Sequence, residues 1–88
     1  MNNPIPEEFT GEEAIGNKTF RWTLRDGVLA KIYTEGSAGP SLCFSMRITR
    51  STRAVRVKAH NGWKLTLDQL EWATYKCIEL IRINSGIT

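Results

Sequence analysis

Cysteine and histidine are scarce in this chain, which has 88 residues, two cysteines and one histidine. Cys43 and Cys77 each lie in an apolar alternation, so the sequence predicts neither a disulfide framework nor a zinc site. No apolar run is long enough to span a membrane, and the first 20 residues hold four acids instead of the apolar segment of a signal peptide. We therefore expect a soluble, intracellular protein that needs no metal, no cofactor and no membrane.

Catalytic motifs are also missing from the sequence. It shows no Ser/His/Asp set and no glycine-rich phosphate loop before a helix. His60 has no acidic residue near it in the sequence. We interpret it as a polar residue at the end of a strand, with phosphate contact as the functional alternative. The chain is not expected to be an enzyme.

Acidic residues are absent between Glu35 and Asp68. Residues 1–17 carry a net charge of −4, residues 18–64 carry +8 and residues 65–88 carry −1, within a total of +3. Such a partition is typical of a polyanion-binding middle with an acidic tail.

The length of the chain limits its core. A domain of 88 residues buries only about 60–65% of the surface of its unfolded chain, so oligomerisation would help to stabilise it. Residues 1–14 contain two prolines and four glutamates with little to bury. This composition predicts a flexible acidic tail, followed by one domain over residues 15–88.

Alternation of apolar and polar residues predicts a sheet with one buried face. From Lys18 onward, Phe20, Trp22 and Leu24 alternate with polar residues, and after a turn at 25–27 the alternation resumes over residues 28–33. The glycines and proline of residues 35–41 predict a loop. A further strand is predicted over residues 42–49.

The segment "RITRSTRAVRVKAH", residues 47–60, has an arginine at every third position, yet most of the residues between the arginines are β-branched. A hairpin with its turn centred on Ser51 and Thr52 resolves this conflict, because it pairs residues whose numbers sum to 103. The apolar residues then share one face, and Arg47 lies across from Arg56 on the other. Like charges directly across two strands destabilise a sheet by up to about 1 kcal/mol, and an anion between them would relieve the repulsion.

A C-terminal helix is predicted after Thr66, which forms a capping box with Gln69, and Gly86 is expected to end it. Its apolar residues cover nearly half of the helix, more than one packing surface needs, while Trp72 and Ile83 lie outside this arc on the far side. The width of the arc predicts that part of the helix contacts a second copy of the chain. The apolar residues of the arc are Leu67, Leu70, Ala73, Cys77, Ile78, Leu80 and Ile81.

Basic residues recur on the predicted non-core face of three successive strand segments. Basic strands often serve solubility alone, but the absence of acids favours contact with a nucleic-acid backbone, whose neutralised phosphates release counterions. Tyr33 shares this face and either stacks on a base or packs on the surface. Phe20, Trp22 and Phe44 fit the core, and Trp63 either plugs the core or stacks. Aromatic rings among basic residues on an open sheet favour single strands.

The order of several short motifs resembles a known family. "AIGNKTFRWTLRDG" precedes an alternating strand that contains "MRI", and a basic stretch ends in "NGWKLTLDQLEW" at the start of the helix. Over residues 14–82 this order is similar to the single-stranded-DNA-binding domain of the eukaryotic transcriptional coactivator positive cofactor four. The resemblance implies an α+β fold with a curved four-stranded antiparallel sheet followed by one C-terminal helix. It also implies a homodimer formed through the helices, with grooves for single strands.

The resemblance also implies roles for individual residues. Arg25 matches the strand-end arginine of the family and Arg47 the groove arginine, while His60 and Asn61 stand where the family has basic residues. The stretch 28–41 is longer than its counterpart, and the serine-rich regulatory tail is missing. A prokaryotic or viral member therefore fits the sequence at least as well as a transcription coactivator.

The sequence thus predicts a non-enzymatic homodimer that binds single-stranded DNA with little sequence preference, in replication, recombination or transcription, alongside replication or transcription proteins. We expect it with DNA, in a nucleoid or host cytoplasm if the source is prokaryotic or viral and in a nucleus if it is eukaryotic. The alternatives are a protein-interaction module whose basic face docks an acidic partner, and an RNA-binding protein. The predicted DNA-binding residues are Arg21, Arg25, Lys31, Tyr33, Arg47, Arg50, Arg53, Arg56, Lys58, Trp63 and Lys64.

Overall fold

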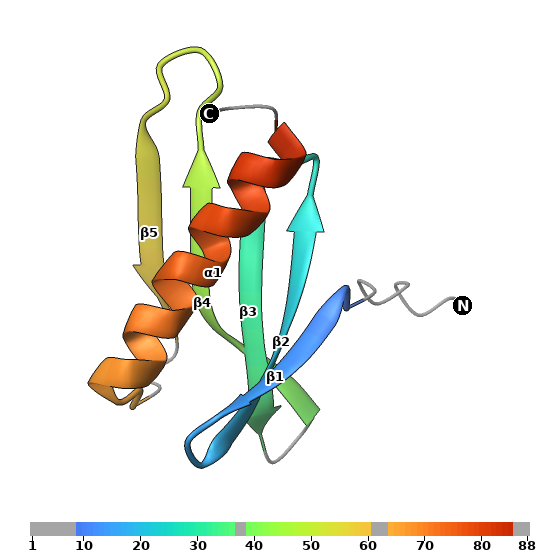
Figure 1. Cartoon of the computed structure of the whole chain (residues 1–88), viewed down its shortest axis with the longest axis vertical. Coiled ribbons are helices and arrows are strands. Elements are labelled where there is room, and N and C mark those ends of the chain that lie inside the picture. Colours follow the sequence, from blue (N-terminus) through green and yellow to red (C-terminus); the bar gives the residue numbers. More distant parts are fainter. Residues whose placement is uncertain (1–8, 37–38, 61–63, 86–88) are drawn as a thin grey trace.

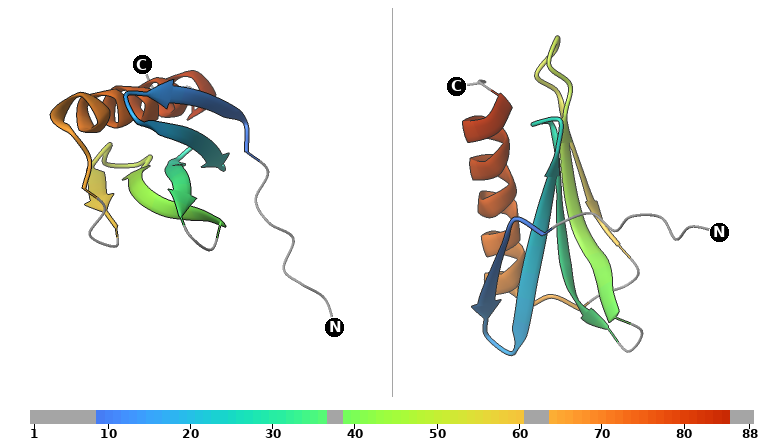
Figure 2. Two further views of the ribbon diagram at one scale, coloured as in Figure 1. Left: turned by 90° about the horizontal axis from the view of Figure 1, so that it is seen from below. Right: turned by 90° about the vertical axis from the view of Figure 1, so that its right-hand side faces the viewer.

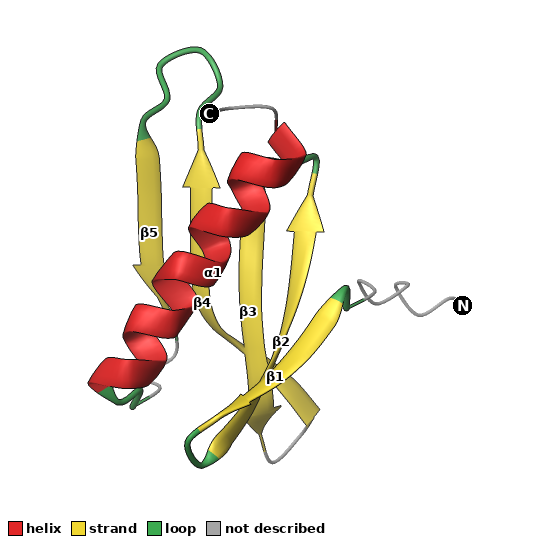
Figure 3. Ribbon diagram, viewed as in Figure 1, coloured by secondary structure: helices red, strands yellow, loops and turns green. Residues whose placement is uncertain are grey.

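The computed structural model describes residues 9–36, 39–60 and 64–85 as one open antiparallel sheet with a helix on one face (Figure 1). The strands lie in chain order across the sheet (Figure 3). The α+β class is confirmed, but the sheet has five strands where four were expected. The elements are β1 (Gly11–Ile15), β2 (Lys18–Arg25), β3 (Leu29–Gly36), β4 (Gly39–Ile48), β5 (Val55–Ala59) and α1 (Leu67–Ser85).

The additional strand is β1, so the prediction that residues 1–14 form a flexible tail is wrong from Gly11 onward. β1 pairs antiparallel with β2, in a register that puts Gly11 opposite Trp22 and Ile15 opposite Lys18. Residue 11 must be glycine because a Cβ there would overlap the Trp22 ring. An edge strand can keep polar side chains in solvent, so its glutamates do not prevent pairing.

The strands β2 and β3 form a hairpin through Asp26 and Gly27, which both have positive φ angles, of 56° and 70°. These angles suit a tight hairpin turn, for which Asp-Gly is a preferred pair. The predicted loop over 35–41 is much too long, because β3 continues to Gly36 and β4 begins at Gly39. The pairing of β3 with β4 shifts between Ile32 and Tyr33, a β-bulge.

The predicted hairpin of β4 and β5 is confirmed in its register. Phe44 pairs with Ala59, Arg47 with Arg56 and Ile48 with Val55, so every pair sums to 103. The turn is closed by a 2.9 Å hydrogen bond from the Thr49 amide to the Ala54 carbonyl.

The helix α1 begins with the predicted capping box. The Gln69 amide donates to Thr66 Oγ1 at 3.1 Å, and the Thr66 amide donates to Gln69 Oε1 at 2.9 Å. Gln69 Nε2 also donates to the Ile15 carbonyl at 3.0 Å and to Asn17 Oδ1 at 3.1 Å. This buried side chain therefore fixes the start of α1 to the turn between β1 and β2. Gly86, the predicted stop, lies outside the described residues.

The core lies between α1 and the middle of the sheet, where Phe20, Ile32 and Phe44 meet Ala73, Cys77 and Ile81. Trp72 was expected on the far side of the helix, and this is wrong: its ring centre lies 5.2 Å from that of Phe20 and 5.8 Å from that of Trp22. Burial raises the pKa of Cys43 to about 11 and that of Cys77 to about 12. Both cysteines are therefore protonated core residues at neutral pH.

The strand β5 is left uncovered by the helix. α1 crosses the sheet diagonally (Figure 1), lies on one face of it (Figure 2) and packs on β3, β4 and β1. On β5, Val55 is 56% exposed and Val57 is 52% exposed, although both point to the helix side of the sheet. The arrangement leaves one sheet face without a covering helix and the other face covered over only part of its width.

Candidate nucleic-acid interface

The sheet face opposite α1, here called the outer face, collects most of the predicted binding residues. Phe20, Ile32, Phe44 and Met46 point to the core, and side chains alternate along a strand, so their polar neighbours point outward. The cross-strand register then forms two rows, Arg25–Leu29–Arg47–Arg56 and Thr23–Lys31–Ser45–Lys58. Tyr33 lies beside Arg21 in the adjoining row. The outer-face members of the predicted set are Arg21, Arg25, Lys31, Tyr33, Arg47, Arg56 and Lys58.

The pair of Arg47 and Arg56 is the most unbalanced part of the outer face. The two arginines lie directly opposite each other on β4 and β5, both exposed. Neither strand contains an acidic residue, and within residues 9–36, 39–60 and 64–85 neither arginine forms an ion pair. The repulsion between them is the cost that an anion would remove.

His60 extends the second row at the end of β5. Its Nε2 shares a 2.8 Å hydrogen bond with Ser45 Oγ on β4. The pKa of His60 is lowered from 6.5 by desolvation and by the positive charges of Lys58 on β5 and Lys31 on β3. The lowered pKa of His60 thus reflects desolvation of the ring first and the two lysine charges second.

The pKa of His60 should report binding of an anion. A phosphate near Lys31 and Lys58 favours the charged imidazole, so an oligonucleotide should raise the pKa of His60. Binding should then tighten as the pH falls from the raised pKa of the bound protein towards the lower pKa of the free protein. The stability of the fold changes with pH in the opposite direction. Because the pKa of His60 is lowered in the folded state, its contribution to the free energy of unfolding is present above pH 6.5 and is lost as the pH falls through the lowered pKa.

NMR titration of the His60 ring with and without oligo-dT measures both effects. The variant His60→Gln should bind with a flatter pH dependence and serves as the control. An imidazole pKa that is the same in the free and bound protein would contradict the placement of phosphate beside this row.

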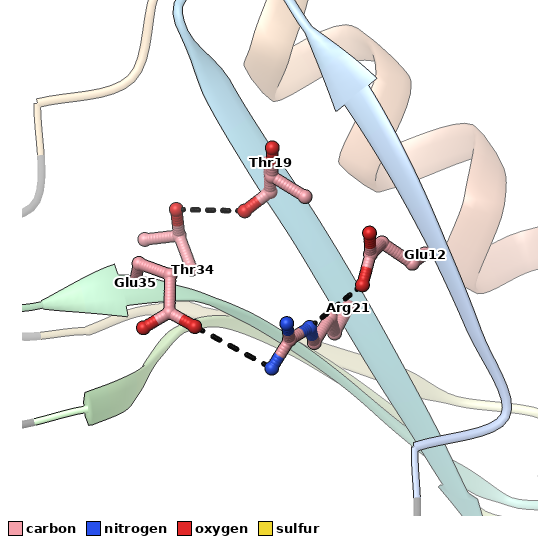
Figure 4. A network of polar contacts seen from close by, with 5 residues as sticks. All are labelled: Glu12, Thr19, Arg21, Thr34 and Glu35. Atoms are coloured by element: carbon pink, nitrogen blue, oxygen red, sulfur yellow. Dashed lines mark hydrogen bonds and ion pairs between the residues drawn. The ribbon is translucent and has the colours of Figure 1, made fainter.

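Arg21 lies at a corner of the outer face that carries acidic residues, contrary to the expectation of a face without them. Its Nε is 2.9 Å from Glu12 Oε1 on β1, and its Nη1 is 3.4 Å from Glu35 Oε1 on β3 (Figure 4). Glu12 was not expected beside Arg21, because residues 1–14 were predicted to form a tail. Glu35 was assigned to a loop instead of the strand that brings it beside Arg21.

The remaining predicted residues do not join these rows. Arg50 Nη2 donates to the Asp26 carbonyl at 2.6 Å and so braces the β2–β3 turn. Arg53, with φ of 61°, lines a groove on the helix side of the sheet. Lys64 is exposed before α1, and Trp63 lies outside the described residues.

Two further side chains of this face are not among the predicted binding residues. Phe9 lies against Tyr33, with ring centres 5.3 Å apart in an edge-to-face arrangement. Thr23, in the second row, is buried, and its hydroxyl has no hydrogen-bond partner in the part of the chain that the structure describes. Alternation places Thr23 on the outer face, but its burial depends on neighbours that the sequence does not identify.

Neither a metal site, a membrane-spanning helix nor a similar known protein adds to the description of the outer face. Among the described residues, no group of His, Cys, Asp and Glu side chains is arranged to hold a metal ion. The same part of the chain contains no helix with the length and apolarity needed to cross a membrane. No protein-family model, no curated protein and no solved structure matches the chain. The likeness to positive cofactor four therefore stays a prediction from the sequence.

Proposed function

We propose that this protein is a non-enzymatic binder of single-stranded DNA with little sequence preference, and that the outer face is its binding surface. The observation that carries the proposal is the directly opposed pair Arg47 and Arg56, continued by Arg25 in the same row. Lys31 and Lys58 form the parallel row. Two rows of cations across neighbouring strands suit a flexible phosphate backbone, and each neutralised phosphate releases counterions.

The preference for single strands rests on Tyr33 and on the nature of the helix. Tyr33 presents an aromatic ring among the cations, and only unstacked bases offer their π faces to such a ring. The helix α1 carries Asp68, Glu71 and Glu79 on exposed positions, which opposes its insertion into a major groove. As a binder of single strands, the protein is proposed to act in replication, recombination or transcription.

The decisive experiment compares labelled oligo-dT, an RNA of equal length and a duplex by fluorescence anisotropy at several salt concentrations. We expect the tightest binding for oligo-dT, with log affinity falling against log salt by about 0.7 per contacted phosphate. Equal affinity for the duplex would refute the preference for single strands, and tighter binding of RNA would change the proposed ligand. Absence of binding to all three probes at about 150 mM salt, where exposed charges are largely screened beyond about 8 Å, would favour an acidic protein partner.

We further propose that the chain acts as a homodimer through the uncovered apolar surface between β5 and α1. A groove of about 320 Å³ runs there between Ile48 and Val55 on one side and Ile78 and Ile81 on the other. Leu67, which is 81% exposed, lies on the same side of α1 as Ile78, about 20° from it around the helix at about 100° per residue. A two-fold axis perpendicular to the helices would set them antiparallel, so that Asp68 in the first turn of one helix approaches Arg82 in the last turn of the other.

The dimer is tested by comparing two exposed apolar residues of α1. Leu67→Glu should halve the mass in light scattering to the 10.0 kDa of one chain, because the charge would be buried at the interface. Ile83→Glu is the matched control, since Ile83 is 72% exposed and lies about 160° around the helix from Leu67 at about 100° per residue. A wild-type mass of one chain at micromolar concentration would refute the dimer, and dissociation by Ile83→Glu alone would refute this interface.

A further inference from the structure

The residues just before β1 lie on the outer face instead of leading away from it. The Phe9 ring stands edge-on to Tyr33, at an interplanar angle of 73°, and the guanidinium carbon of Arg21 lies 5.6 Å from the centre of the same ring. Phe9 thus contacts Tyr33 and Arg21, an aromatic residue and an arginine that are both proposed to bind DNA.

The next outward-pointing strand residue adds a negative charge to this contact. Glu12 accepts a 2.9 Å hydrogen bond from Arg21 Nε, and the register of β1 with β2 sets the two residues directly opposite each other. Arg21 therefore holds an aromatic ring and a carboxylate from one short stretch of chain. Glu13, the neighbouring residue, pairs with Phe20 and points to the other face.

An aromatic ring on Tyr33 together with an anion on Arg21 is the combination that a nucleotide offers through its base and its phosphate. We propose that Tyr33 and Arg21 form a nucleotide subsite, and that Phe9 and Glu12 occupy it as an internal competitor. This inference rests on the proposed function and adds a regulation to it. The competitor acts at a high effective concentration because it is part of the same chain.

Opening the subsite requires little rearrangement of the sheet. Phe9 precedes β1, and the last backbone contact before the strand is the hydrogen bond from the Thr10 amide to the Trp22 carbonyl, at 2.8 Å. Rotation of the chain before Thr10 moves the Phe9 ring away and leaves β1 paired. Glu12 stays in the strand, so its carboxylate leaves Arg21 by a change of side-chain rotamer.

The subsite also explains why Arg21 is held between two carboxylates while Arg47 and Arg56 are not. Glu12 and Glu35 neutralise Arg21 in the free protein. A phosphate must displace at least one of them, so this corner should bind more weakly than the two rows of cations. Release of the competitor should therefore strengthen binding, because Tyr33 and Arg21 become available to the nucleotide.

The test compares Glu12→Gln with Glu13→Gln in the full chain, which remove the same charge from adjacent residues of one strand. We expect Glu12→Gln and Phe9→Ala each to tighten binding of a labelled oligo-dT about three- to tenfold at low salt, and Glu13→Gln to change it less than twofold. Phe9→Ala should have no such effect in a Tyr33→Ala background, because the ring that it uncovers is then missing. Circular dichroism checks that each variant folds.

A second measurement separates this inference from the function on which it rests. Proton NMR should show contacts between the Phe9 and Tyr33 rings in the free protein, and these should disappear as oligo-dT is added. Wild-type binding with persisting ring contacts, or equal effects of Glu12→Gln and Glu13→Gln, would overturn the competitor and leave DNA binding intact. Failure of the wild type and all variants to bind oligo-dT would overturn the proposed function and the subsite with it.

Discussion

Replacing Arg47 and Arg56 together by glutamine is expected to weaken binding of single-stranded DNA by about 25-fold at 0.1 M salt. Each phosphate contact contributes a salt slope of about 0.7, which is about fivefold in affinity at that concentration, and two contacts multiply. The slope itself should fall by about 1.4. The two arginines are the directly opposed pair on β4 and the edge strand β5, so their loss removes the densest charge of the surface.

The same double variant should be slightly more stable than the wild type. Removing two like charges that face each other across β4 and β5 relieves a repulsion worth up to about 1 kcal/mol. Weaker binding by a more stable protein cannot be attributed to unfolding. Thermal unfolding and anisotropy titration of the same samples measure both effects.

The control for this variant removes two charges from the helix instead. Lys76→Gln with Arg82→Gln should lower affinity less than threefold, because both residues lie on α1, away from the outer face. Arg82 also lines the groove of the proposed dimer, so the two double variants are compared at a concentration where light scattering gives them the same mass. Lys76 packs over the Trp22 ring at 4.6 Å and pairs with Glu79 at 3.1 Å, so a small loss of stability accompanies this control. Equal loss of affinity in the two double variants would show that net charge alone, and not the outer face, binds the DNA.

The variant Gln69→Ala is expected to lower the free energy of unfolding by about 2–4 kcal/mol, the largest effect of any single substitution proposed for this chain. Gln69 is 1% exposed, and its side chain serves the Ile15 carbonyl, Asn17 Oδ1 and the Thr66 amide. Truncation leaves all three groups without this hydrogen-bond partner. The loss costs about 1 kcal/mol or more for each group that water does not reach. Alanine is the best helix former, so the loss does not come from helix propensity.

Chemical denaturation of Gln69→Ala and of Glu71→Ala makes the comparison direct. Glu71 is exposed two residues further along α1, and its replacement should change the stability by less than about 0.5 kcal/mol. Gln69→Glu keeps the size of the side chain but removes the amide donor, so it should be nearly as harmful as alanine at neutral pH. Similar midpoints for all three variants would show that the clamp between α1 and the β1–β2 turn contributes little.

The parts of the fold predicted correctly are those in which a repeating pattern had only one consistent solution. The β4–β5 register followed because only pairing around Ser51 and Thr52 put Phe44, Met46 and Ile48 with the valines of the other strand on one face. The capping box followed because Thr66 and Gln69 stand three residues apart at the start of an apolar period.

The errors arose where the outcome depended on contacts distant in the sequence. β1 has little strand propensity, and it is held by Trp22 packing over Gly11 and by Glu12 pairing with Arg21. Trp72 fell outside the apolar arc of the helix, yet the neighbouring β2 presents Phe20 and Trp22 to it. Glycines at 36 and 39 indicated a long loop, although strands tolerate glycine next to a hairpin turn.

The same distinction between repeating local patterns and contacts distant in the sequence applies to the candidate site. Alternation along each strand placed Lys31, Arg47, Arg56 and Lys58 on one face, and the register confirms their grouping. Arg50 and Arg53 belong to the turn, where alternation no longer determines direction, and they point elsewhere. Phe9 was not considered because nothing in its own neighbourhood of sequence relates it to Tyr33.

The position of β5 at the edge of the sheet has a thermodynamic consequence. All five of its residues are exposed, and it is paired only with β4, so its amides should exchange with solvent through local opening well below the global stability. Alternate residues point to opposite faces: Val55 and Val57 point to the helix side of the sheet, and Arg56 and Lys58 point to the proposed binding surface. In the proposed dimer, a second chain in the groove would close the strand and hold both cations in place before DNA arrives. By linkage, the factor by which dimer formation tightens DNA binding would equal the factor by which DNA tightens the association of the two chains.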